Sequence, residues 1–216
     1  TPTDLTPTKK DFTLSSYRFR RYVLYLFCST VLSASAERTA AAEQNLLPNP
    51  DFEQKPAEES IAPAWSLRDP EGAMLRTDGG HTGQQYVHFI DKGKGGIFLE
   101  SERLPARPGG FYTATAWFRT DQKINPGIYV NFYDNEGSRV HHAYQRIEGP
   151  TEGWEKNRVS AIAPRCSKVS VTLYSYAADT GEFDADDVTL VVEGGDEPLA
   201  EKPRPEPEEK GPVDIG

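Results

Sequence analysis

Short runs in which apolar and polar residues alternate follow one another through the middle of the chain. Between 128 and 133, for example, Ile128, Val130 and Phe132 occupy every second position. This period of two is the pattern of a half-buried β-strand, because successive side chains of a strand point to opposite faces of the sheet. A helical period is not sustained anywhere between 45 and 193. We expect strands at 85–90, 96–101, 111–120, 128–133, 140–147, 156–163, 168–176 and 182–192.

Turn sequences rich in glycine, proline and asparagine separate these runs. Examples are Arg107-Pro108-Gly109-Gly110 and Asn125-Pro126-Gly127, which favour tight reversals of the chain. Short strands at such spacings are typical of a β-sandwich, and the lack of intervening helices disfavours a βαβ fold. We therefore predict an all-β sandwich of two antiparallel sheets over residues 45–193.

The N-terminal part of the chain differs in composition from this middle part. Residues 1–17 are polar and rich in Thr and Pro, and we expect them to be disordered. Residues 18–36 combine a basic flank, an apolar stretch and a small-residue exit, in the order of an export signal. The alternative is a buried core helix. We expect an exported protein, periplasmic, at the cell surface or extracellular, with no membrane insertion after the signal is removed.

Residues 195–216 form a second region of distinct composition. Prolines alternate there with Glu and Lys, a mixture that cannot bury a core and favours a stiff, extended linker. We expect this linker to lead to a further domain beyond residue 216. Removal of the signal would also remove Cys28 and leave Cys166 alone, so no internal disulfide is expected.

Charge and motifs narrow the classes of function. The net charge is −9, and an acidic surface repels phosphate backbones, so we expect no nucleic acid partner. His141 and His142 are adjacent and would face opposite sides of a strand, which disfavours a shared metal site. The sequence lacks a nucleophile elbow, a His-Glu-x-x-His motif and a phosphate-binding loop. These observations disfavour an enzyme.

Two segments near the ends of the predicted sandwich place carboxylates beside apolar residues. The first is Asn45-Leu46-Leu47-Pro48-Asn49-Pro50-Asp51-Phe52-Glu53, and the second is Phe183-Asp184-Ala185-Asp186-Asp187-Val188-Thr189-Leu190. Carboxylates beside a core are costly unless a cation meets them. If the segments come together, Glu53, Asp186 and Asp187 can supply oxygen ligands for calcium. The alternative is a pair of solvated strand ends with ordinary surface acids.

Four of the predicted strands carry aromatic residues on the face that should be polar. One explanation is cross-strand pairs that stabilise the sheet, or a face covered by a loop or partner. The other is a ligand surface, since aromatic rings suit the CH-rich faces of sugars and polar neighbours suit their hydroxyls. The candidate ligand-binding residues are Trp117, Arg119, Tyr129, Asn131, Tyr133, Tyr174, Tyr86 and His88, with Trp117 as the principal anchor.

In their order, these features resemble a bacterial carbohydrate-binding module of the galactose-binding-like jelly-roll type. The resemblance is to the cellulose-, xylan- and β-glucan-binding modules attached to polysaccharide-degrading enzymes, and it covers about residues 45–193. It is carried by the segment at 45–53, the turn and strand at 107–119, the strand and turn at 130–137, Gly153-Trp154, and the closing segment at 183–190.

The resemblance implies a non-catalytic jelly-roll module. It implies a structural calcium bound by Glu53 and by Asp187 or Asp186. It also implies that a polysaccharide or glycan lies on a concave sheet face lined by the outward aromatic residues. Ligand choice varies within such modules, so the fold does not name the sugar. The alternative is a protein–protein or cell-envelope interaction domain on the same fold, with no sugar ligand.

Overall fold

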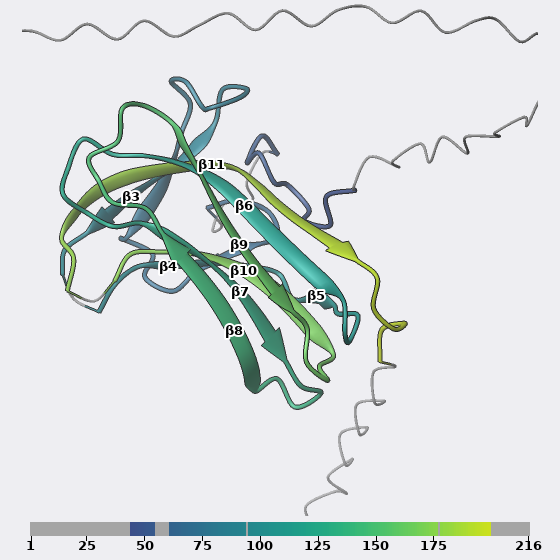
Figure 1. Ribbon diagram of the computed structural model, residues 1–216. Coiled ribbons are helices and arrows are strands. Elements are labelled where there is room, and N and C mark those ends of the chain that lie inside the picture. Colours follow the sequence, from purple (N-terminus) through teal and green to yellow (C-terminus); the bar gives the residue numbers. More distant parts are fainter. Residues whose placement is uncertain (1–43, 55–60, 94, 177, 200–216) are drawn as a thin grey trace, which may run out of the picture. The chain divides into compact units, whose positions relative to one another are not determined.

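The structure is a computed structural model in which two antiparallel β-sheets face each other (Figure 1). Within the described residues the chain forms eleven strands and no helix. The described residues are 44–54, 61–93, 95–176 and 178–199. The strands are β1 (Trp65–Leu67), β2 (Ala73–Arg76), β3 (Tyr86–Asp91), β4 (Phe98–Ser101), β5 (Leu104–Pro105), β6 (Phe111–Arg119), β7 (Gly127–Tyr133), β8 (Arg139–Arg146), β9 (Glu155–Ile162), β10 (Lys168–Tyr174) and β11 (Gly181–Glu193).

Each sheet mixes strands that are far apart in sequence. In the sheet that we call sheet A the order is β1-β4-β10-β7-β8, with β5 pairing beside β10. In sheet B the order is β2-β3-β11-β6-β9. All pairings are antiparallel. The prediction of an all-β sandwich of two antiparallel sheets is therefore confirmed.

The predicted strands are all present, and their ends lie within two residues of the predicted ends. The sequence pattern missed β1, β2 and β5, which have three, four and two residues. A strand that short does not repeat the alternation of apolar and polar residues often enough to be recognised.

Several predictions concern residues without a described structure. The N-terminal extension at 1–17 and the export signal at 18–36 lie outside the described residues, as does most of the predicted linker, 200–216. Among the residues that are described, none belongs to a helix long and apolar enough to cross a bilayer.

The core lies between the two sheets and is built by one face of each strand. In β6 the inward residues are Tyr112, Ala114, Ala116 and Phe118, as the alternation predicts, and all are fully buried. Phe89 of β3 and Phe183 of β11 stack with ring centroids 4.4 Å apart. From sheet A the core receives Ile128, Val130, Phe132, Val169, Val171 and Leu173.

The lone described cysteine belongs to this core. Cys166 is buried, and burial raises the pKa of its thiol to about 11. A thiol with so high a pKa is a poor nucleophile, because the reactive form is the thiolate. Cys166 is therefore a small packing residue.

A β-bulge in β11 changes which residues face the core. The pairing with β6 runs from Asp186 opposite Trp117 to Thr189 opposite Thr115, so two residues of β11 stand against Ala116 alone. Asp187 has a φ of 47°, the left-handed conformation that Asp tolerates better than most residues. Before the bulge Phe183 and Ala185 are buried, and after it Val188 and Leu190 are buried. The extra residue therefore keeps both halves of the strand apolar on the inner side.

We predict that Phe183→Ala lowers the free energy of unfolding by about 3–5 kcal/mol, because it removes a buried aromatic ring and leaves a cavity. Urea unfolding followed by circular dichroism measures the change. The control is Val140→Ala on β8, whose side chain is 45% exposed and whose loss should cost no more than about 0.5 kcal/mol. Equal effects of the two substitutions would contradict this description of the core.

Candidate functional site

The predicted ligand-binding residues do not form one surface. The eight side chains belong to two groups, one on each sheet. Both groups point away from the core, which lies between the sheets, so they occupy opposite outer faces. The alternation of residues assigns a side chain to a face, but it does not tell which sheet a strand joins. Sheet B carries Trp117, Arg119, Tyr86 and His88, whereas sheet A carries Tyr129, Asn131, Tyr133 and Tyr174.

On the outer face of sheet A, aromatic side chains form a row across four neighbouring strands. Phe98 of β4 stands opposite Tyr174 of β10, and their rings are stacked. The Tyr174 ring lies 4.4 Å from that of Tyr129 on β7, which in turn lies 5.4 Å from that of Tyr144 on β8. We call these four residues the aromatic row. Phe98 and Tyr144 were not among the predicted residues, although period-2 alternation in their strands places them on this face.

Much of this face is closed by its own side chains. Tyr174 is fully buried, and Asn131 and Tyr133 are 2% and 5% exposed. The Asn131 amide donates to Thr172 Oγ1 at 2.9 Å, and the Tyr133 hydroxyl donates to Glu100 at 2.6 Å. The prediction that Asn131, Tyr133 and Tyr174 point outward is correct, but their polar groups and rings are covered.

The Tyr174 hydroxyl is a special case within this covered area. It is buried and has no hydrogen-bond partner among the described residues. Burial also raises the pKa of Tyr174, with the nearby Tyr129 as a further cause. An unpaired buried hydroxyl costs free energy, so this position would gain from a polar group brought to it.

The accessible part of the aromatic row lies at its β8 end. Tyr144 is 52% exposed and Tyr129 is half-buried. His142 and Arg146 share this face of β8, because they alternate with Ala143 and Gln145. Burial, followed by the cationic Arg139, lowers the pKa of His142, so its ring is neutral at neutral pH. A hollow of about 340 Å³ opens at the same edge and is lined by Asn125, Tyr144, Gln145, Arg146, Ile147 and Glu148.

On the outer face of sheet B, Trp117 is partly covered by neighbouring groups. The His81 ring stacks on it with centroids 3.8 Å apart, and the Lys156 ammonium lies 5.8 Å from its centroid. Trp154, just before β9, lies edge-on to Tyr86 and under the guanidinium of Arg119, 4.5 Å away. Trp117 is thus packed against the loop that contains His81.

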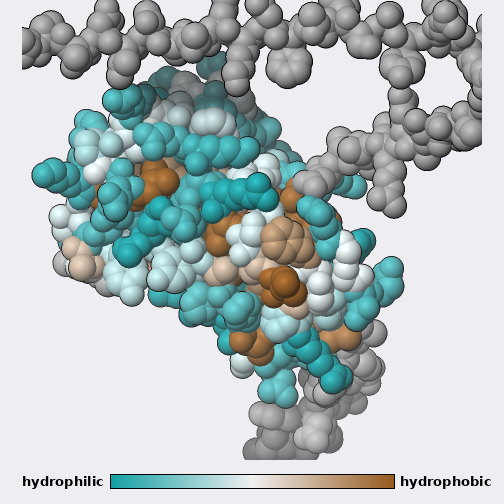
Figure 2. Space-filling model, in the orientation of Figure 1, coloured by the Kyte–Doolittle hydropathy of each residue, from teal (hydrophilic) through white to brown (hydrophobic). Residues whose placement is uncertain are grey.

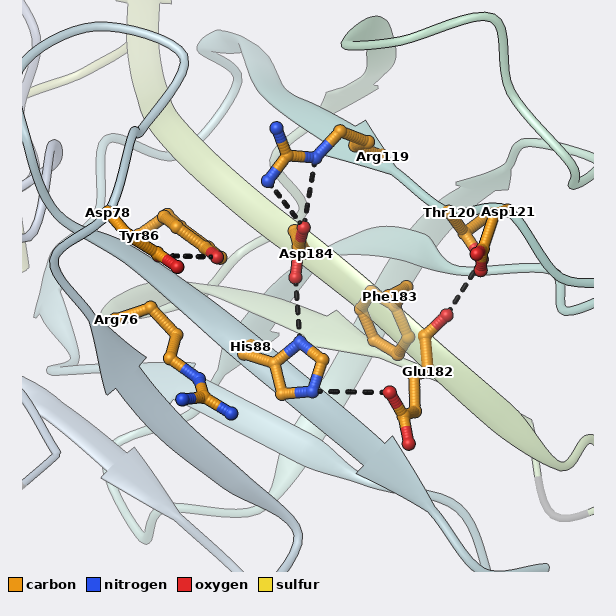
Figure 3. A pocket seen from close by; sticks show the side chains of 10 residues that line it. All are labelled: Arg76, Asp78, Tyr86, His88, Arg119, Thr120, Asp121, Glu182, Phe183 and Asp184. Carbon is orange, nitrogen blue, oxygen red and sulfur yellow. Dashed lines mark hydrogen bonds and ion pairs between the residues drawn. The ribbon is translucent and has the colours of Figure 1, made fainter.

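Beside this cluster a pocket of about 480 Å³ opens on sheet B. The Arg119 guanidinium donates twice to Asp184 Oδ2, at 2.9 and 2.7 Å, and His88 Nδ1 lies 2.8 Å from Asp184 Oδ1 (Figure 3). The Tyr86 hydroxyl donates to Asp78 at 2.8 Å. Predicted residues Tyr86, His88 and Arg119 are therefore together here, joined by acids that the sequence did not single out.

The three predicted metal ligands gather around one loop, residues 79–85. Glu53 Oε1 accepts from the backbone N–H groups of Gln84 and Gln85, at 2.6 and 2.7 Å. These bonds, that of Gln85 first, lower the pKa of Glu53. Asp186 Oδ2 accepts from the backbone of His81, and Asp187 accepts from the Thr82 hydroxyl, both at 2.7 Å. The loop therefore joins the beginning of the sandwich to its last strand.

Asp186 is the fully buried member of this group. Its side chain is fully buried, and burial raises its pKa to about 7. Among the described residues no Lys or Arg forms an ion pair with it, and no group of three or more His, Cys, Asp or Glu side chains is arranged to hold a metal. Backbone oxygens would have to supply much of any coordination shell.

Such backbone oxygens are present over Gly80. A Cβ atom at Gly80 would lie 2.6 Å from Gln85 O and 2.7 Å from both Thr82 O and Asp186 Oδ2. Two carbonyls and a carboxylate thus converge where only glycine leaves room. Calcium prefers this set of oxygen donors, at about 2.3–2.6 Å. Asp186 and the loop carbonyls are thus donors of the kind that calcium takes, and Glu53 bonds to the backbone of the same loop.

Known structures share this fold. The module TmCBM61, solved in complex with β-1,4-galactotriose, is similar with 19% identity and a TM-score of 0.50, over 70% of this chain and 100% of that one. The CBM22-2 xylan-binding domain of Paenibacillus barcinonensis Xyn10C is similar with 16% identity and a TM-score of 0.51, over 66% and 97%. The chain has the jelly-roll fold of these carbohydrate-binding modules. No family model and no curated protein matches the sequence itself.

The same fold also occurs in enzymes. A cyclase from Fischerella sp. TAU is similar with 14% identity and a TM-score of 0.54, over 70% of this chain and 98% of that one. In a bacteriophage CBA120 tailspike domain and the MgGH51 α-L-arabinofuranosidase, at TM-scores of 0.55 and identities of 11% and 18%, the match covers 69% of this chain but spans only 21% and 26% of theirs. At such identities the likeness establishes the jelly roll, while function must be argued from the site.

The packing around Trp117 leads to a prediction. We expect Trp117→Ala to lower the free energy of unfolding by about 1–3 kcal/mol, because the ring is half-buried against His81. Urea unfolding gives the change. The matched control is Tyr144→Ala, an aromatic truncation at an exposed position of sheet A, which should cost no more than about 0.5 kcal/mol. Unchanged stability in the Trp117 variant would mean that its ring does not support the loop.

Proposed function

We propose that this chain is a non-catalytic carbohydrate-binding module of an exported protein, and that a polysaccharide or glycan lies against the β8 end of the aromatic row. The observation that carries the proposal is the row itself. Its rings span four neighbouring strands on one face, and they become accessible at Tyr129 and Tyr144.

The chemistry of this edge suits a sugar chain. The rings of Tyr129 and Tyr144 offer apolar area to the CH groups of sugar rings, and a tyrosine hydroxyl can form hydrogen bonds with sugar hydroxyls. His142 and Arg146 add groups that can bond to sugar hydroxyls on the same face of β8. Arg139 and Arg146, at the two ends of this edge strand, also discourage its pairing with another sheet, because they are charged.

The distribution of exposed hydrophobic residues favours a sugar over a protein partner. Most of the visible surface is hydrophilic, and its hydrophobic side chains form small separate groups (Figure 2). The large exposed ones are spread over several strands: Met74, Phe111, Val140, Tyr144, Ile162 and Tyr176. A protein interface usually needs a larger continuous apolar area at its centre.

We also propose a structural calcium held by Asp186 and the carbonyls of Thr82 and Gln85, with Glu53 and Asp187 fixing the loop around it. A bound calcium would neutralise the buried Asp186 carboxylate. The loop then fastens the start of the sandwich to β11, so the ion acts on stability and not on a reaction. The close approach of these carbonyls and Asp186 Oδ2 to Gly80 supports the site.

The glycan proposal predicts that Tyr144→Ala weakens polysaccharide binding about tenfold or more, since aromatic anchors commonly contribute about 2 kcal/mol or more. The measurement is affinity gel electrophoresis of the full chain in gels containing xylan, β-glucan or β-1,4-galactan. The control is Phe111→Ala, an exposed aromatic residue on sheet B, which should migrate like the unaltered protein.

Two results would contradict the glycan proposal. One is retardation that is equal in the unaltered protein and in the Tyr144→Ala variant. The other is the absence of retardation by all three polysaccharides, together with concentration-dependent self-association, which would favour an interaction domain.

The calcium proposal predicts that calcium raises the melting temperature and that a chelator lowers it, because a ligand bound only by the native state stabilises it. Asp186→Asn, which keeps the size of the side chain and removes its charge, should abolish this difference. The control is Asp69→Asn, at an exposed turn, which should respond to calcium like the unaltered protein. A melting temperature independent of calcium in the unaltered protein would refute the site.

A further inference from the structure

The pocket on the outer face of sheet B is separate from the aromatic row and differs from it in chemistry. Its walls come from β2, β3, β11 and the end of β6, and its volume is about 480 Å³. Small-ligand sites typically measure about 300–1,000 Å³. We propose that this pocket is a second binding site, which takes a single neutral sugar residue, free or at the end of a chain. This goes beyond the proposed function and does not depend on it.

The floor of the pocket consists of charged and polar side chains that are hydrogen-bonded to one another. Arg119 holds one oxygen of Asp184 with two hydrogen bonds, and His88 Nδ1 meets the other oxygen (Figure 3). The side chains of Asp184 and His88 are 14% and 16% exposed. Such a network is preorganised, so a ligand would meet groups already held in place.

This arrangement leaves acceptors facing the pocket. In the tautomer whose Nδ1–H donates to Asp184, Nε2 of His88 is an acceptor. Nε2 lies 3.5 Å from Glu182 Oε2, which is longer than the usual range of about 2.7–3.2 Å for an N–H···O bond. Glu182 Oε2 can therefore take a hydrogen bond from a ligand hydroxyl, and Nε2 can take one in the same tautomer.

Donors face the same space from the opposite side. The guanidinium of Arg76, on the edge strand β2, points toward His88 in the close view (Figure 3). Among the described residues it forms no hydrogen bond or ion pair. A guanidinium offers five N–H donors and no acceptor. Donors and acceptors that line one pocket suit a molecule rich in hydroxyl groups, because each hydroxyl both donates and accepts.

The charge balance of the pocket selects among sugars. Two arginines line it, against the four carboxylates of Asp78, Asp121, Glu182 and Asp184. Acids in excess repel a ligand that carries its own carboxylate. The pocket should therefore prefer neutral sugars to uronic acids. Its limited volume also favours one sugar residue over a chain that lies across the sheet.

The experiment is a titration of the full chain with methyl β-glycosides of xylose, galactose and glucose and with free arabinose, read by saturation-transfer NMR. Glucuronate and galacturonate are titrated in parallel. We expect saturable binding of at least one neutral sugar and weaker binding of both uronates. Arg76→Ala and Glu182→Gln should each weaken the neutral sugar about tenfold or more, the loss of one hydrogen bond to a charged group. Phe111→Ala, on the same sheet but outside the pocket, should bind normally.

Several outcomes would overturn the second site. They are no saturable binding of any neutral sugar, uronates that bind as tightly, or unchanged affinity in both pocket variants. Circular dichroism checks that each variant is folded, and the isosteric Glu182→Gln decides the matter if Arg76→Ala is unfolded. Polysaccharide retardation should be unaffected by Arg76→Ala. A variant that loses monosaccharide binding but is still retarded by polysaccharide identifies the pocket as a separate site. Monosaccharide binding without retardation by polysaccharide means that the proposal for the aromatic row fails and the proposal for the pocket does not.

Discussion

The bulge in β11 is the constraint on which the rest of this structure depends. β11 is the middle strand of sheet B and pairs with β3 on one side and β6 on the other. Without the extra residue at Asp187, either Phe183 and Ala185 or Val188 and Leu190 would face solvent, because a shift of one residue turns every side chain over. The bulge lets both halves bury their apolar residues. It also places two consecutive carboxylates at the point where the strand changes phase.

That position explains why the loop at 79–85 lies where it does. A buried Asp186 needs hydrogen bonds, and the loop supplies them through its backbone. The N-terminal segment is fastened to the same strand. Asn45 Oδ1 accepts from the backbone of Leu190, and its amide donates to Val188 O. The two ends of the sandwich are thus joined twice over a short stretch of β11, beside the loop and just beyond the bulge.

The sequence was sufficient for the eight longer runs of strand and for the faces of their side chains, because both follow from a local period of two. The bulge can also be recognised in the sequence, since the apolar residues of β11 change from the odd positions 183 and 185 to the even positions 188 and 190. What the sequence could not supply is the membership of the two sheets. Strand order depends on long-range pairing, so Trp117 and Tyr129 look equivalent along the chain although they occupy opposite faces. The burial of outward-pointing side chains could not be predicted either, since Tyr174 points outward and is nevertheless covered by neighbours from other strands.

Placement on opposite faces decides what two sugar sites can do together. Two sites on one face of a module can grip the same chain, so the second contact becomes intramolecular and raises the overall affinity. Sites on opposite sheets of a sandwich are separated by the whole core, and a short chain cannot reach both. Such a pair of sites would add little affinity for one polysaccharide chain. It would instead connect two polysaccharide chains, one lying along the β8 edge of sheet A and the other with its end in the pocket of sheet B.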